Sequence, residues 1–136
     1  MSAAINPKDD VRGWVRKAEV DFSAVRILMA TGKDCPAEAV CFHAQQCVEK
    51  YLKAILCFLG RDFPFNHDIG ELSALLPPSV SIPITIQEQD QLTAYAVDSR
   101  YPDPEKEIGF TEAAGAARWM ESTRSALRNS LPGDVL

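Results

Sequence analysis

The sequence predicts an all-α protein, an antiparallel up-and-down bundle of four to five helices. Apolar side chains recur at helical spacing through most of the 136 residues. The alternation typical of a strand occurs only near residues 80–86, where Pro83 argues against an inner strand. Short segments rich in proline or glycine separate the helical stretches, so consecutive helices should lie antiparallel.

The two longest helices come first. Residues 9–31 repeat apolar side chains every three or four positions, and Gly32 provides a stop. A second helix is expected over residues 36–59, where Pro36 suits the first turn and Gly60 follows the last residue. Its apolar positions cover one broad face, which is typical of the central helix of a bundle.

Two shorter helices should follow a loop at residues 61–67. Asp68 and Glu71 have the spacing of a capping box, so a short helix should begin there and end before Pro77. After an irregular connection, helical spacing resumes near residue 86.

A second loop, at residues 99–105, contains two prolines that exclude a helix. The last helix is expected over residues 111–129, with an alanine-rich face that allows close approach to a core neighbour or to a dimer partner. Residues 131–136 are expected to be a tail.

Composition narrows the functional classes. Apolar residues make up 46% and charged residues 24%, as in an average soluble domain. The net charge of -5 gives no general affinity for nucleic acid, so any contact with RNA or nucleotide must come from a local patch. The absence of a signal-like or spanning apolar run, together with four cysteines without a C-x-x-C pair, favours a cytoplasmic protein with reduced thiols and no membrane contact.

Several kinds of site are disfavoured by missing motifs. The sequence has no P-loop, no G-x-G-x-x-G, and no carboxylates spaced for Mg²⁺, which argues against self-sufficient nucleotidyl transfer. Two histidines do not have the spacing of a zinc site. We therefore expect neither a metal nor a cofactor.

One face of the second helix carries donors and positive charge. His43, Gln46, Lys50 and Lys53 fall within about 80° of one another around the helix axis. Such a strip can hold a phosphate. It is equally the pattern of a solvated face with a packed histidine, or of a polar strip at a subunit interface.

The loop that follows offers a catalytic pair. Arg61 and His67 have residue types suited to metal-independent RNA cleavage, in which the 2′-hydroxyl attacks its own phosphate. The simpler alternative is that His67 caps the next helix or bonds a neighbouring backbone group, and that Arg61 lies on the surface. In the second loop, Arg100 and Tyr101 are stiffened by prolines, and they either recognise a ligand or brace the end of the bundle.

These motifs together resemble the HEPN domain family. Residues 42–56, FHAQQCVEKYLKAIL, look like its signature second helix. Residues 67–72, HDIGEL, and residues 99–102, SRYP, occur in the same order as in that family, and residues 14–29 resemble its first helix. The resemblance covers roughly residues 10–130, so we expect one HEPN-like domain over residues 1–136 with short tails.

The resemblance implies a helical bundle that commonly forms a homodimer. HEPN proteins of bacteria and archaea are often encoded beside a minimal nucleotidyltransferase, in two-component systems of toxin–antitoxin type. Many members are ribonucleases with an Arg-x4-6-His motif, whose two copies meet across the dimer. Others are thought to bind nucleotides or to act as accessory modules.

Three hypotheses follow. In the first, the protein is the partner of a minimal nucleotidyltransferase and binds a nucleotide or RNA phosphate through His43, Lys50, His67 and Arg100, with Tyr101 stacking on a base. In the second, Arg61-x5-His67 is the catalytic pair of a metal-independent endoribonuclease, since no histidine follows Arg100. In the third, these polar residues only organise a helical interaction module.

Overall fold

The computed structural model describes residues 7–98 and 107–136, and all regular structure within these ranges is helical. The elements, in chain order, are α1 (Pro7–Met29), the 3-10 turn η1 (Gly32–Asp34), α2 (Ala37–Phe58), α3 (Ile69–Ala74), α4 (Ile86–Asp98), α5 (Phe110–Asn129) and the 3-10 turn η2 (Gly133–Val135). The predicted all-α bundle is confirmed. No helix in the described part of the chain is long and apolar enough to cross a membrane.

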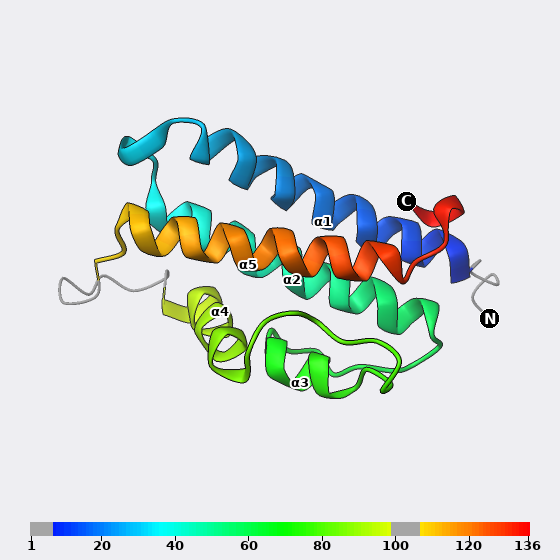
Figure 1. The fold of residues 1–136 in the computed structure, drawn as a ribbon. Helices are drawn as coiled ribbons and strands as arrows, with labels where there is room; N and C mark the ends of the chain where they lie inside the picture. Colours follow the sequence, from blue (N-terminus) through cyan, green and yellow to red (C-terminus); the bar gives the residue numbers. More distant parts are fainter. Residues whose placement is uncertain (1–6, 99–106) are drawn as a thin grey trace.

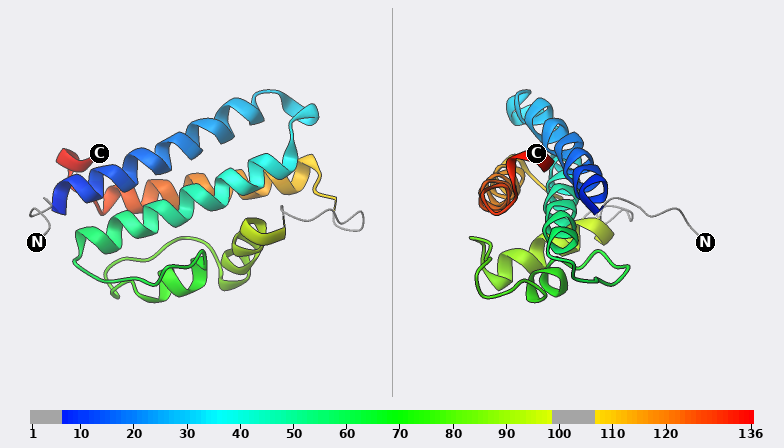
Figure 2. Two further views of the ribbon diagram at one scale, coloured as in Figure 1. Left: turned by 180° about the vertical axis from the view of Figure 1, so that it is seen from behind. Right: turned by 90° about the vertical axis from the view of Figure 1, so that its right-hand side faces the viewer.

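Helix α2 is the centre of the fold. It packs against α1, α5, α4 and α3. Figure 1 and Figure 2 show α1 running antiparallel to α2, while α3 and α4 lie on the opposite side of α2. The α3–α4 segment returns the chain to the end of the bundle at which α5 begins, so α5 runs beside α2 in the same direction.

The core is built from side chains of α2 and small residues of α5. Thirteen residues of α2 are buried, and Tyr51, Leu52 and Ile55 are fully enclosed. On α5, Ala113 and Ala116 are 0% exposed, because their short side chains allow α5 to approach α2 closely. The alanine-rich face of the last helix therefore serves the core.

Two predicted helix boundaries, the start of α3 and the end of α2, are confirmed in detail. The side chain of Asp68 accepts a hydrogen bond from the Glu71 backbone N–H at 3.0 Å, which caps α3. The Glu71 carboxylate bonds the side chain of Asn66 instead of returning to the cap. Gly60 ends α2 with a φ of 69°, a left-handed conformation that glycine adopts without strain.

The prediction that residues 131–136 form a tail is wrong, because these residues fold back onto the bundle. Leu131 and Val135 are buried, and η2 packs against α1. Arg12 Nε donates to the backbone carbonyl of Asp134 at 3.0 Å, which fixes the turn. The physical reason is burial of apolar surface, since Leu131 and Val135 join the same core as Leu127 of α5.

The four cysteines carry free thiols. Burial raises the pKa of Cys41 to about 12 and also raises the pKa of Cys47. These two thiols pack as small apolar side chains of the core, and neither has the environment of a nucleophile.

Candidate functional site

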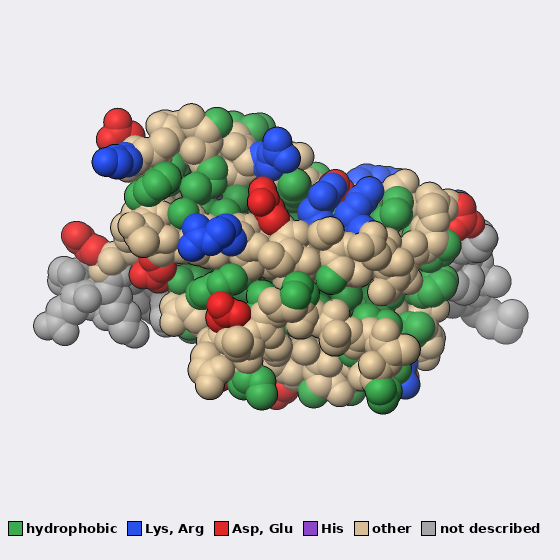
Figure 3. Space-filling view, viewed as in Figure 1, with side chains coloured by type: hydrophobic (Ala, Val, Ile, Leu, Met, Phe, Trp, Pro, Cys, Tyr) green, Lys and Arg blue, Asp and Glu red, His purple; other side chains and the backbone are tan. Residues whose placement is uncertain are grey.

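The polar strip of α2 lies between α1 and the segment that leads to α3. Figure 2 shows α2 bordered by α1 on one side and by α3 and α4 on the other. His43 and Lys50 are partly exposed, with 33% and 22% of their side chains accessible. Neither histidine is visible on the opposite face, which α1 and α5 form in Figure 3. The candidate site therefore occupies one side of the molecule.

A buried carboxylate from α1 holds one end of the strip. Asp21 is 5% exposed. It accepts from His43 Nδ1 at 2.8 Å and from Lys50 Nζ at 2.6 Å. His43 and Lys50 are seven positions apart on α2, which places them two turns apart on one face. Asp21 bridges these two turns, so α1 fixes the orientation of both side chains.

A second buried carboxylate holds the other end. Glu49 is 3% exposed and accepts from three side chains: Gln45 Nε2 at 3.0 Å, Lys53 Nζ at 3.1 Å and His67 Nδ1 at 2.9 Å. Gln45 also donates to the His67 carbonyl at 3.3 Å. Both the ring and the backbone of His67 are thus tied to α2, although 57% of its side chain is accessible to solvent.

The two carboxylates determine which ring nitrogens are available. Each histidine has its Nδ1 within hydrogen-bonding distance of a carboxylate oxygen, which accepts only. A neutral ring must therefore carry its proton on Nδ1, and the lone pair on Nε2 is left for an outside group. A protonated ring presents an N–H at the same position.

Lys53 is enclosed by aromatic rings. Its Nζ lies 5.3 Å from the centroid of the Trp14 ring and 5.7 Å from that of Phe63, and these two rings meet edge to face. Because Trp14 is on α1 and Phe63 precedes His67, Lys53 joins α1 and the α2–α3 loop to α2. This ammonium group is a structural element, and it does not contribute to the exposed part of the strip.

A third carboxylate, Glu19, fastens α1 to α5. It accepts two hydrogen bonds of 2.7 Å from Arg124 and one of 2.5 Å from the Tyr51 hydroxyl. The hydrogen bonds from Arg124 lower the pKa of Glu19, while burial raises the pKa of Tyr51 to about 12. This contact lies on the side away from the histidines and holds α1, and hence Asp21, in position.

Arg61 and His67 contact different parts of the chain. Arg61 Nη1 donates to the carbonyl of Leu75 at 2.8 Å, just beyond the C-terminal end of α3. His67 precedes Asp68, the N-cap of the same helix. These two anchor points are seven residues apart, about 10 Å along a helix. As the simpler alternative proposed, Arg61 lies on the surface, but Asp68, and not His67, caps α3.

Arg100 and Tyr101 lie outside the described residues, so their predicted contribution to the site stays a prediction. In the described part of the chain, no group of three or more His, Cys, Asp and Glu side chains is arranged to hold a metal ion.

A family model for the HEPN domain matches residues 11–129 of the chain. The protein belongs to the HEPN family. Two solved structures have the same fold. TT1696 from Thermus thermophilus is 24% identical, with a TM-score of 0.74 over 89% of this chain and 98% of that one. ST0689, described as an archaeal HEPN homologue, is 25% identical, with a TM-score of 0.67 over 88% and 96% of the two chains. No curated protein matches this chain.

Asp21 and Glu49 are the residues of this HEPN domain that reasoning from the sequence did not assign to the site. Each left a signal. Asp21 falls within the apolar stripe of α1 beside Val25, and an acidic residue in such a stripe requires a cationic partner. Glu49 precedes Lys53 by four positions, which is the spacing of a helical ion pair.

Proposed function

We propose that this HEPN protein binds a phosphate of a nucleotide or of RNA on the exposed strip of α2, and that it acts as the partner of a minimal nucleotidyltransferase in a two-component system of toxin–antitoxin type. The observation that carries the binding proposal is the pair of carboxylate–histidine contacts, Asp21–His43 and Glu49–His67. They orient both imidazoles through Nδ1, which leaves both Nε2 atoms available, and Lys50 shares Asp21 with His43.

The donors of the strip are oriented and retain unused capacity. The ammonium group of Lys50 has three N–H donors, and one is bonded to Asp21. Gln46 uses its amide nitrogen toward Gln45 at 2.5 Å and has a second N–H on the same atom. Fixed donors lose less side-chain entropy when they close on a phosphate.

The strip would recognise a phosphate through hydrogen-bond donors more than through net charge. Asp21 and Glu49 offset the charges of Lys50 and Lys53. Phosphate oxygens accept hydrogen bonds, so the unused N–H groups of Lys50 and Gln46 would hold them, and His43 and His67 offer their Nε2 atoms as further contacts.

Calorimetry tests this directly. Titrating AMP or a short RNA into the protein measures the dissociation constant. His43→Gln and His67→Gln should each weaken binding, whereas Lys33→Gln, on the exposed turn η1, should not. Binding that is unaffected in both histidine variants would contradict the proposed site.

The partner proposal rests on family membership. Co-expression with a minimal nucleotidyltransferase encoded beside this chain, followed by affinity purification of one component, tests whether a complex forms. Recovery of this protein alone, under conditions in which both are soluble, would leave the binding proposal standing and refute the partnership.

One observation favours the endoribonuclease as a second candidate. The Glu49-oriented imidazole of His67 is exposed and can exchange a proton with a substrate. Arg61 would first have to leave the Leu75 carbonyl. Incubation with RNA in EDTA, with Arg61→Ala and His67→Ala as comparisons, decides the matter. Cleavage that leaves 2′,3′-cyclic phosphate ends and is lost in both variants supports the enzyme, and no cleavage above the variants' background refutes it.

A further inference from the structure

A line of arginines follows the seam between α1 and α5, on the face without the histidines. Arg12, Arg16 and Arg26 of α1 fall within about 80° of one another around that helix. Arg124 and Arg128 of α5 reach the same seam, because both approach the carboxylate of Glu19 on α1. We call these five residues the arginine track. Figure 3 shows blue side chains gathered on this face.

The charge of the chain is unevenly divided. Three acidic residues border the track, namely Glu19, Glu121 and Asp134, so the seam carries a net charge of about +2. The rest of the chain then has nine basic residues against sixteen acidic ones. A protein with an acidic net charge thus presents one local surface of opposite sign, and this surface attracts an anion with several charges.

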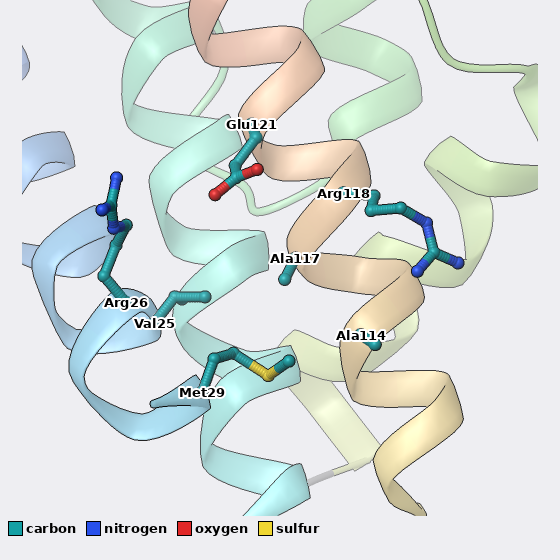
Figure 4. Close-up of a pocket in the computed structure, with 7 residues that line it drawn as sticks. All are labelled: Val25, Arg26, Met29, Ala114, Ala117, Arg118 and Glu121. Atoms are coloured by element: carbon teal, nitrogen blue, oxygen red, sulfur yellow. The ribbon is translucent and has the colours of Figure 1, made fainter. Parts of the chain in front are cut away.

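An apolar recess lies beside the Arg26 end of the track. It has a volume of about 280 Å³ and is lined by Val25, Met29, Ala114 and Ala117, with charged residues at its edge. Figure 4 shows the Met29 side chain within the recess, while the guanidinium group of Arg26 points away from it. The cations do not converge on one point, so the surface suits an extended polyanion with apolar groups better than a single small anion.

We propose that the arginine track binds the phosphodiester backbone of a single-stranded nucleic acid, with a base in the adjoining recess. Guanidinium groups match phosphate geometry, and unpaired bases are available to an apolar pocket. The track spans fifteen residues of α1, from Arg12 to Arg26, whose ends are about 21 Å apart along the helix, enough for several nucleotides. This surface is separate from the α2 strip, and the proposal does not rest on the function proposed for that strip.

Salt dependence of binding is the test. Fluorescence anisotropy of a labelled oligouridylate of about 12 nucleotides, a length within the usual site sizes, is measured over a range of salt concentrations. Each phosphate contact adds about 0.7 to the slope of log K against log salt for a single strand. Arg16→Gln with Arg26→Gln should therefore reduce the slope by about 1.4. Lys17→Gln with Lys33→Gln removes the same charge away from the track and should leave the slope unchanged.

Competition by other polyanions distinguishes which class of anion the arginine track binds. Oligothymidylate should compete if the backbone is recognised in general, and failure to compete assigns the track to RNA. Inorganic polyphosphate, which lacks bases, should compete weakly. Equal competition by polyglutamate would show a surface for acidic protein and would overturn the proposal. Absence of binding at low salt, or an equal reduction of the salt slope in both double variants, would also overturn the proposal. Binding lost only in His43→Gln would refute the track and support the α2 strip.

Discussion

Replacing Glu49 should show how much its buried carboxylate contributes to the free energy of unfolding. Glu49 accepts hydrogen bonds from Gln45, Lys53 and His67 at 2.9–3.1 Å and is 3% exposed. In Glu49→Leu, Lys53 would stay buried without its counter-ion, and removing one partner of a buried ion pair costs about 3–5 kcal/mol. The two aromatic rings around Lys53 recover part of this cost, so we expect a loss of about 3 kcal/mol.

The double variant makes this reasoning testable. In Glu49→Leu with Lys53→Met, both charges are replaced by apolar groups of similar size, and such replacements are often neutral or stabilising. We expect the double variant to regain much of the loss and to remain about 1–2 kcal/mol less stable than the wild type, because the buried Gln45 side chain keeps one N–H without a partner. Urea denaturation followed by circular dichroism gives each free energy of unfolding. Glu38→Leu, an exposed site on the same helix, is the control and should cost less than about 1 kcal/mol.

A loss below about 1 kcal/mol in the single variant would show that Lys53 reaches water when its partner is removed. Additive losses in the double variant would show that packing, and not charge, determines the effect.

Three further predictions concern other parts of the fold. The pKa of Glu19 is lowered mainly by Arg124, so its stabilising contribution is complete above pH 4.5 and is lost as the pH falls below 4.5; urea titrations should show a flatter acid limb in Glu19→Gln. Because the pKa of Cys41 is about 12, that thiol should resist an aromatic disulfide reagent at pH 8 in the native protein and react in urea, as mass spectrometry of the labelled peptides would show. Deleting residues 131–136 should cost about 3 kcal/mol in urea unfolding, since Leu131 and Val135 are buried; an unchanged midpoint would show that the turn η2 adds no stability.

Helical spacing was sufficient to predict the fold of this HEPN domain because each long helix has one dominant apolar face. The helix boundaries also follow from local chemistry, as the end of α2 at Gly60 and the Asp68 N-cap of α3 show. The packed C-terminal turn was missed because three apolar residues in six, Leu131, Val135 and Leu136, give too short a pattern to distinguish from a tail. Its burial depends on the nearby surface of α1, which no local pattern reveals.

The candidate site could be predicted only in part. The strip of α2 could be found because residues on one helix have a fixed angular relation. Its contact with Asp21 could not, because the Asp21–His43 contact joins residues 22 positions apart on different helices. Glu49 is on α2 itself, and its spacing to Lys53 was the signal that the sequence offered. The separation of Arg61 from His67 likewise depends on α3 lying between their anchor points. Contacts between residues on different helices depend on how the helices pack, and a local sequence pattern does not specify that packing.

The two proposed surfaces should respond differently to solution conditions, and the reason lies in their acidic residues. On the α2 strip each lysine is matched by a buried carboxylate, so binding there should depend only weakly on salt. On the arginine track the cations outnumber the carboxylates and keep their charge at any physiological pH, so binding there should depend strongly on salt. A single nucleic acid that contacts both faces would lose most of its salt dependence when the track is changed and little of it when the strip is changed.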